Sequence, residues 1–353
     1  MMAEVIKRHN HYVPEMYLNN WAQNKKVCTY QLLTSHENVP IWEPKAVKKS
    51  ASIDNLYVRQ SKGKEADDFE DFFMRYYETP AKGPLIKACT NQHMSSEDWW
   101  KLIEFVAAQI VRTPAYYFKI HGIFREAMPG ILDTVAADIG ALSAVDLSQR
   151  PKKNKDDELI PVVANDTGIK PDDKHTVLKI ETVIGKSMWF RSIKYLLSEG
   201  SPILHQHKWS IITAAEEVKW PTSDDPVICL IHTGPGEYNF QGKWGQSGAE
   251  IIMPISPTKA LYTQVGNKQS PRIALDSERT RLIKKIIVQH AFMYVYASEP
   301  DDEIPSIRPR IVDLVEYERV EKEYKKWYDY YQEKEVPFLE TKKQEPDNDL
   351  PYD

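Results

Sequence analysis

The feature that most constrains the fold is a helix-forming apolar stretch over residues 97–113. Ser95 or Ser96 can cap its start, acidic residues follow at once, and Pro114 bounds its end. Its apolar side chains occur nearly all round the helix rather than along one stripe, which is typical of a helix buried on most sides. Other elements must therefore pack around this helix.

The remaining pattern predicts an α+β fold, with a helical N-terminal and central part followed by a mainly antiparallel sheet with flanking helices. Helical periodicity dominates before residue 200, and short apolar runs between Pro and Gly follow it. The expected helices are residues 14–22, 66–77, 97–113, 116–137 with a break at Pro129-Gly130, 177–198, 277–290 and 310–333. The expected strands are residues 27–32, 53–58, 207–213, 226–231, 250–255, 259–265 and 292–297.

We expect one α+β domain over residues 1–335, with a flexible insertion near residues 148–175. The insertion is polar, charged and rich in turn-forming residues, as long surface loops are. Residues 336–353 are expected to form a disordered tail.

Composition excludes some classes of protein. A net charge of −5 argues against an overall basic nucleic-acid or membrane binder, although a local basic groove stays open. The chain start has no apolar stretch, and the longest apolar run, Leu102–Val111, is too short to span a bilayer. The three cysteines are far apart in sequence and fit a reducing compartment. We therefore expect a cytoplasmic protein that does not insert into a membrane.

The common catalytic motifs are missing from the sequence, including the P-loop, the dinucleotide-binding glycine pattern, HExxH and GxSxG. Glu217-Val218-Lys219 matches the E-x-K of some nucleases, but this tripeptide is common by chance. His205 and His207 have a spacing compatible with a metal, yet no acid is close in sequence, so an edge strand is the favoured interpretation.

The first polar segment in an apolar setting is residues 8–14. In an extended chain His9 and His11 point to one face, a spacing compatible with a metal or an anion. The structural alternative is that His11 hydrogen-bonds a carbonyl group and Tyr12 packs in the core. The sequence leaves the two interpretations balanced.

The second segment is residues 109–114. Gln109, Arg112 and Thr113 share the helix face that carries Leu102 and Phe105. Burying an Arg costs several kcal/mol unless it is paired, so Arg112 needs a carboxylate partner or an anionic ligand. A structural ion pair is the slightly favoured alternative.

The third segment, residues 220–226, ends with Ser223, Asp224 and Asp225 before an apolar strand. Two carboxylates at the mouth of a strand can hold a divalent cation or act as a general base. Ser and Asp before Pro are also ordinary turn formers, so a capped turn is an equal alternative. A fourth segment, Met253–Pro257, has two prolines that fix the exit of a strand.

Together these segments resemble the family catalogued as domain of unknown function 4238. The likeness spans roughly residues 8–297 and rests on four motifs in order: an HYVPxxYLxxF/W pattern at His11–Trp21, a Q-x-x-R-T/S-P pattern at Gln109–Pro114, a T-S-D-N-P-V pattern at Thr222–Val227, and P-x-S-P at Pro254–Pro257. Asp225 departs from the family pattern, which has Asn there. The resemblance supplies no reaction, but it implies that the four motifs belong to one domain.

The residue types of these motifs favour hydrolysis of an anionic substrate, most simply a phosphodiester, as a nuclease would perform it. Arg112 would bind the anion, His11 would transfer a proton, and Asp224 would orient His11 or hold a metal. The residues expected to bind substrate are His9, Tyr12, Gln109, Thr113 and Ser223. The cofactor of such chemistry would be a divalent metal such as Mg²⁺ or Mn²⁺, with Asp224 and Asp225 as candidate ligands.

The partner of such an enzyme would be nucleic acid or a small anionic substrate. The alternative is a non-catalytic binding or structural module, in which the same polar residues form a buried network. An enzyme should place these groups around a solvent-open pocket, whereas a structural network should seal them from water.

Overall fold

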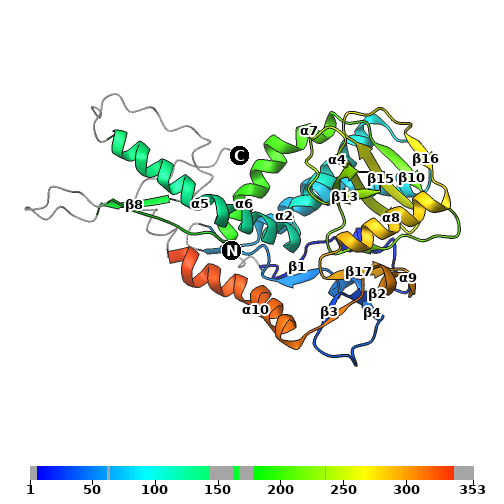
Figure 1. The fold of residues 1–353 in the computed structure, drawn as a ribbon, viewed down its shortest axis with the longest axis horizontal. Helices are drawn as coiled ribbons and strands as arrows, with labels where there is room; N and C mark the ends of the chain where they lie inside the picture. The colour runs from blue at the N-terminus through cyan, green and yellow to red at the C-terminus, as the bar shows by residue number, and fades with distance from the viewer. Residues whose placement is uncertain (1–5, 62–63, 143–161, 167–177, 235, 338–353) are drawn as a thin grey trace, which may run out of the picture. The chain divides into compact units, whose positions relative to one another are not determined.

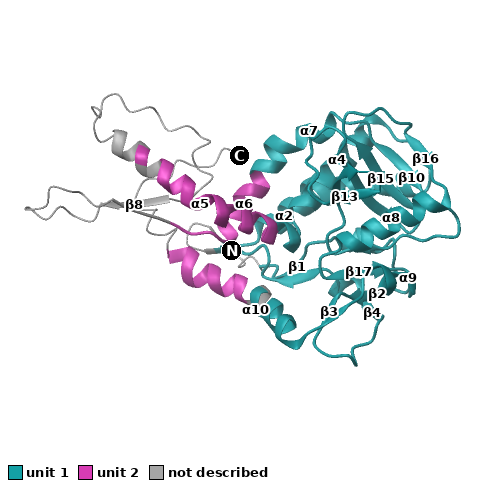
Figure 2. Cartoon of the chain, viewed as in Figure 1, with its two compact units in different colours: residues 1–116, 195–324 teal, residues 117–194, 325–353 magenta. Residues whose placement is uncertain are grey.

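Packing divides the chain into two compact units (Figure 2). Unit 1 comprises residues 1–116 and 195–324, and unit 2 comprises residues 117–194 and 325–353. The computed structural model describes residues 6–61, 64–142, 162–166, 178–234 and 236–337. The expectation of a single domain over residues 1–335 stays a prediction.

Unit 1 contains a six-stranded sheet in the order β13-β12-β14-β15-β10-β16 (Figure 1). Every neighbouring pair is antiparallel except β10 and β16, which run parallel. The strands are β10 (Ser210–Thr213), β12 (Ile228–Gly234), β13 (Glu237–Asn239), β14 (Glu250–Ser256), β15 (Lys259–Gln264) and β16 (Arg272–Ala274). The predicted α+β class with a mainly antiparallel sheet is confirmed.

A second sheet in unit 1 has the order β11-β17-β2-β4 and is antiparallel throughout. Its strands are β11 (Thr222–Ser223), β17 (Tyr294–Ala297), β2 (Lys26–Gln31) and β4 (Glu43–Ala46). The sequence predicted β2 and β17 as strands but gave no sign that they pair, because the pairing joins the two ends of the unit.

Three two-stranded ladders complete unit 1. β1 (His9–His11) pairs antiparallel with β5 (Ser52–Asp54), and β6 (Arg59–Ser61) with β7 (Lys64–Ala66). β3 (Leu33–Thr34) pairs parallel with β18 (Ile311–Val312). The expected strand over residues 53–58 is thus shorter than predicted, since a turn follows Asp54.

The helices of unit 1 begin with α1 (Glu15–Leu18), which ends four residues earlier than the predicted 14–22. The others are α2 (Asp68–Phe73), the π-helix η2 (Met74–Glu78), α3 (Thr79–Cys89), α4 (Ser96–Val111), the π-helix η5 (Leu196–Gly200), α7 (Ser201–His205), α8 (Ser277–His290) and α9 (Glu303–Ile307). A short 3-10 helix, η1, covers Val47–Lys49.

The core of unit 1 forms where α8 packs on the six-stranded sheet (Figure 1). Three isoleucines of α8 join buried residues of β10, β12, β14 and β15 in one apolar cluster: Ile283, Ile286 and Ile287. Five consecutive residues of β14 are buried, which requires cover on both faces of the sheet. The helix α4 is buried nearly all round, as predicted.

The described helical segments of unit 2 belong to α5 (Pro114–Leu142), α6 (Lys186–Tyr195), the last part of α10 (Leu314–Tyr330) and the π-helix η6 (Tyr331–Glu335). The expected break at Pro129-Gly130 is wrong, since α5 continues through Pro129. Both residues face solvent, where water can satisfy the carbonyl group that a proline leaves unbonded.

Two further predictions for unit 2 are corrected. The expected helix over residues 177–198 begins with a strand, β9 (Leu178–Thr182), which pairs with β8 (Val162–Asp166) inside the expected loop of residues 148–175. Strand pairing here overrides the local helical pattern. The rest of that loop, residues 148–161 and 167–175, lies outside the described residues.

The expected disordered tail of residues 336–353 stays a prediction. Residues 336 and 337 continue the helix, while residues 338–353 lie outside the described part of the chain. Glu335 is buried, and its carboxylate accepts the backbone N–H groups of Lys186 at 2.7 Å and Ser187 at 2.8 Å. It therefore caps the N-terminus of α6, where a negative charge is favourable. A Cβ on Gly185 would lie 2.1 Å from this carboxylate, so a larger residue at this position would displace the carboxylate from the cap.

Within the ranges that the structure describes, no helix combines the length and apolar character needed to cross a membrane.

Ser95 rather than Ser96 caps α4, and the expected result is that Ser95→Ala lowers the free energy of unfolding by about 1 kcal/mol. The Ser95 hydroxyl accepts the Asp98 N–H at 3.1 Å, and the Asp98 carboxylate accepts the Ser95 N–H at 2.9 Å. Urea unfolding of Ser95→Ala beside the matched control Ser96→Ala measures the difference. Equal losses in both variants would contradict this assignment of the cap.

Candidate functional site

The first motif is held by the ladder of β1 and β5, which places both histidine rings 5.3 Å apart. The Nε2 atoms of His9 and His11 lie 3.0 Å and 3.2 Å from the carbonyl oxygen of Lys48. The other ring nitrogen of His9 lies 2.9 Å from the Asp54 carboxylate, and this hydrogen bond raises the pKa of His9. Burial lowers the pKa of His11. Both rings are thus engaged with backbone or acid.

Arg112 lies at the C-terminus of α4 with no exposed surface. Its Nη1 donates to the Glu78 carboxylate at 2.7 Å, and its Nη2 donates to the carbonyl oxygen of His11 at 2.5 Å. The guanidinium lies 4.3 Å from the centre of the Phe73 ring and contacts the Tyr57 hydroxyl through Nε at 3.3 Å. The carboxylate partner that a buried arginine requires is therefore Glu78.

A second acid, Glu70, lies near the same guanidinium. Burial and the charge of Glu78 raise the pKa of Glu70 to about 7, while Arg112, Lys7 and Asn10 act in the opposite direction. One of its oxygens is buried without a hydrogen-bond partner among the described residues. Burial outweighs the attraction of the shared cation, so Glu70 binds a proton below about pH 7.

The neighbours of Arg112 join the first three motifs. The side-chain amide of Gln109 donates to the carbonyl oxygen of Tyr12 at 2.6 Å. The Thr113 hydroxyl donates to the carboxylate of Asp225 at 3.1 Å. The three segments that carry His11, Arg112 and Asp224 therefore lie in one neighbourhood, although they are far apart in sequence.

Asp224 is buried, and its carboxylate faces the start of β17. It accepts the backbone N–H groups of Phe292 at 2.9 Å and Met293 at 2.7 Å. Burial raises its pKa to about 7, and these N–H groups act against that rise. Among the described residues, no hydrogen bond or ion pair joins this carboxylate to the side chains of His11 or Arg112.

Asp225 and Ser223 form the turn that the structural alternative predicted. The Ser223 hydroxyl donates to the carbonyl oxygen of Asp225 at 2.9 Å and accepts its N–H at 3.2 Å. One Asp225 oxygen accepts from Thr113, and the other lies 3.7 Å from Nε2 of His290. The oxygens of both candidate metal ligands, Asp224 and Asp225, are thus turned to internal partners.

The fourth motif joins the same network through the first. The Tyr17 hydroxyl donates to the carbonyl oxygen of Pro254 and contacts the Thr222 hydroxyl, both at 2.6 Å. Tyr17 carries one proton, so Thr222 donates to Tyr17. The indole N–H of Trp21 donates to the carbonyl oxygen of Trp220 at 2.8 Å. All four motifs are therefore connected by hydrogen bonds.

The sequence missed Glu78, Glu70 and Tyr57, which complete the surroundings of Arg112. The sequence feature that could have indicated Glu70 and Glu78 is their place in the aromatic-rich run EDFFMRYYE, where an acid has no packing role of its own. Sequence alone does not show that this run lies against the end of α4.

Two cavities of unit 1 lie away from this network. One of about 820 Å³ is lined by β13, α8 and the segment after α9, and one of about 380 Å³ is lined by residues 216–221, α8 and residues 297–303. The second contains the E-x-K tripeptide, but Lys219 pairs with Glu299 at 2.6 Å and Glu217 accepts from Ser277. Among the described residues, no three His, Cys, Asp or Glu side chains form a group that could hold a metal ion.

His205 and His207 do not lie on an edge strand as predicted. His205 ends α7, and its Nε2 lies 2.5 Å from the Glu104 carboxylate, an acid that sequence distance concealed. Trp100 stacks on the His205 ring at 3.7 Å. His207 contacts the carbonyl oxygen of Trp244 at 2.5 Å. Both histidines therefore have structural partners.

A family model described as "Protein of unknown function (DUF4238)" matches residues 9–301. No curated protein and no solved structure matches the chain. The family match therefore indicates common ancestry but no activity, so the function must be inferred from the geometry of the network.

Glu70→Gln is expected to weaken the dependence of stability on pH. The folded state keeps the Glu70 proton up to about pH 7, whereas the unfolded state releases it near 4.5, so the free energy of unfolding falls as pH rises through this window. The glutamine variant lacks this contribution, and its loss between pH 5 and pH 8 should be smaller by about 1–3 kcal/mol.

Denaturant unfolding at both pH values measures the effect, with Glu97→Gln as a matched exposed control. Asp224 contributes in the same direction in all three proteins and cancels in the comparison. A Glu70→Gln profile parallel to that of the wild type would disprove the raised pKa.

Proposed function

The chain belongs to the family described as "Protein of unknown function (DUF4238)", and we propose that its four motifs form a structural network inside a non-catalytic binding module. The observation that carries this proposal is the burial of the two central side chains: Arg112 has 0% and Asp224 has 2% of its surface exposed. A substrate must reach a catalytic group, and neither side chain lines either of the two cavities described above.

The hydrogen bonds of the network support the same conclusion. Arg112 donates hydrogen bonds to Glu78, the His11 carbonyl oxygen and Tyr57, and none of its surface is exposed to a substrate anion. Both carboxylate oxygens of Asp224 accept hydrogen bonds from backbone N–H groups. A buried network in which most polar groups are hydrogen-bonded favours one arrangement of the elements that it joins.

The competing proposal is phosphodiester hydrolysis with His11, Arg112 and Asp224 and a divalent metal. It requires the carboxylates of Asp224 and Asp225 to leave their internal partners and the core to open toward solvent. Desolvated groups held by several hydrogen bonds resist such a change, because each lost bond leaves an unpaired buried group. We therefore rank binding above hydrolysis.

The ligand of the module, in this proposal, is a small anionic molecule rather than a long nucleic acid, since the net charge of −5 opposes a polyanion. We also propose a cytoplasmic location, which the free state of Cys28, Cys89 and Cys229 supports.

Arg112→Ala is expected to lower the free energy of unfolding by about 3–5 kcal/mol, because it leaves the half-buried carboxylate of Glu78 without its cation and opens a space in the core. Asp224→Asn should cost about 1–3 kcal/mol, because an amide cannot accept from two N–H groups with both of its ends. Arg279→Ala, an exposed arginine with a 3.8 Å contact to Asp276, serves as the control and should change stability little.

The same proteins are assayed for hydrolysis of RNA, DNA and small phosphodiesters with and without Mg²⁺ or Mn²⁺. We expect no turnover by the wild type and a clear loss of melting temperature in both network variants. Wild-type turnover that disappears in variants of unchanged stability would overturn the proposal and support the hydrolase.

A further inference from the structure

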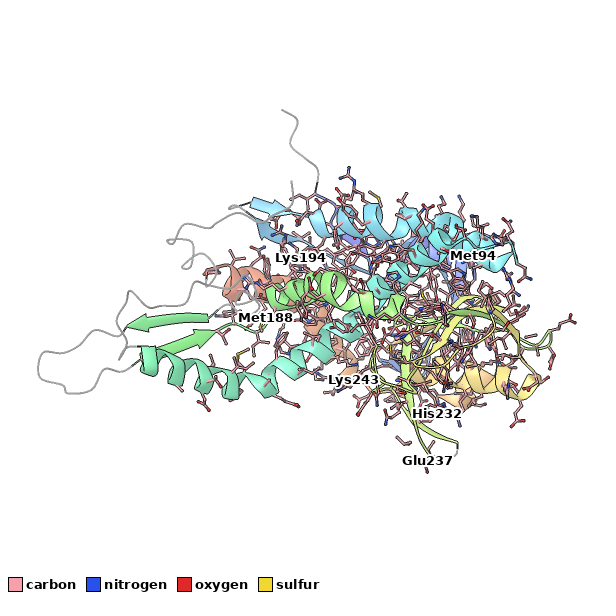
Figure 3. All side chains as sticks on the ribbon, turned by 90° about the horizontal axis from the view of Figure 1, so that it is seen from above. Met94, Met188, Lys194, His232, Glu237 and Lys243 are labelled. Carbon is pink, nitrogen blue, oxygen red and sulfur yellow. The ribbon has the colours of Figure 1, made fainter. Side chains whose placement is uncertain are left out.

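The larger cavity, of about 820 Å³, lies in unit 1 between the β12–β13 hairpin, the C-terminal half of α8 and residues 307–309. Figure 3 labels His232 and Glu237 on this hairpin, at the edge of the six-stranded sheet. Its volume falls in the range of small-molecule sites. None of its lining residues belongs to the four motifs.

One wall of the cavity is aromatic and firmly held. Tyr238 and Phe240 line it with ring centres 5.8 Å apart, and both pack against the core cluster beneath α8. The Tyr238 hydroxyl donates to the side-chain oxygen of Gln289 at 2.5 Å, so the amide N–H groups of Gln289 remain as donors. Fixed aromatic rings beside a free amide suit a flat ring with polar edges.

Arg308 adds a positive charge that forms no ion pair among the described residues. Its guanidinium is partly buried, and its hydrogen bonds to described residues all come from Nη1, to the carbonyl oxygens of Val288, Gln289 and Ala291. Among the described residues no carboxylate forms an ion pair with it, in contrast to Arg112 with Glu78. The charge of Asp224 acts on Arg308 without a direct contact, so Nε and Nη2 of this partly desolvated guanidinium can still donate to an anion from outside.

Lys285 lines the same cavity from α8 and is exposed. In the described part of the chain it forms no ion pair either, whereas its neighbour on the helix, Lys284, pairs with Asp301 and Glu303. Glu237 is the single acid among the lining residues. The cavity thus offers two cations against one carboxylate, next to an aromatic wall.

We propose that this cavity, bounded by Tyr238, Lys285 and Arg308, binds a small molecule that joins a planar ring to an anionic group. The proposal rests on the binding-module function and names the site and the ligand class for it. The ring lies against Tyr238 and Phe240, and the anion lies between Lys285 and Arg308. A nucleoside monophosphate combines both features and is the probe of choice.

The experiment titrates the full-length protein with AMP, GMP, UMP and inorganic phosphate by calorimetry. We expect at least one nucleotide to bind the wild type more tightly than phosphate does. Lys285→Glu should weaken that binding by about tenfold or more, because it replaces an attractive charge with a repulsive one. Lys268→Glu makes the same charge change on an exposed lysine outside the cavity and should alter Kd less than about twofold.

A second variant, Tyr238→Leu, tests the ring separately from the charge, with its melting temperature measured in parallel. Loss of the preference for nucleotide over phosphate in a folded Tyr238→Leu protein supports the aromatic wall. The proposal is overturned if no nucleotide binds at millimolar concentration, if phosphate binds as tightly as the nucleotides, or if Lys285→Glu and Lys268→Glu behave alike.

Failure here is distinguishable from failure of the binding-module function. Hydrolysis of a phosphodiester by the wild type would contradict the binding-module function, and the nucleotide titration would then be judged separately. Absence of nucleotide binding removes this site and leaves the stability results for Arg112 and Asp224 unaffected.

Discussion

The rest of unit 1 depends on one buried charge. The guanidinium of Arg112 stays protonated in a protein, so its desolvation must be compensated by groups that the fold brings to it. Glu78 comes from η2, the accepting carbonyl group from β1, and Tyr57 from the segment after β5. The positions of these three elements around α4 are therefore coupled, and Thr113 extends the coupling to the start of the second sheet through Asp225.

The sequence predicted well what local interactions determine. The ends of α8 and the cap of α4 follow from side chains within a few residues of each terminus, and the strands β14 and β15 follow from short apolar runs. The sequence did not predict features that depend on contacts with distant segments of the chain. Pairing with β8 turned residues 178–182 from helix to strand, and no local pattern showed that the Glu335 carboxylate caps α6, 149 residues away in sequence.

The sequence predicted which residues lie together in the candidate site, but it did not predict whether they are exposed to solvent. His11, Arg112 and Asp224 do belong to connected segments, but the same residue types serve a catalytic centre and a satisfied network, and only burial separates the two. The cavity beside α8 could not be found from the sequence at all. Tyr238, Lys285 and Arg308 form no motif, and they meet because the sheet, the helix and the segment after α9 converge.

The place of β2 in the second sheet has a consequence for the newly made chain. β2 lies between β4, a near neighbour in sequence, and β17, in which Ala297 pairs with Cys28. During synthesis the β2–β4 hairpin leaves the ribosome with one edge open, and at typical elongation rates it waits for β17 for roughly tens of seconds. An open edge with buried-type side chains such as Val27 and Tyr30 is prone to pair with other chains. Nascent molecules of this protein should therefore be substrates for chaperones that bind extended segments. Removing such chaperones should lower the yield of folded protein more than it lowers the stability of the molecules that do fold.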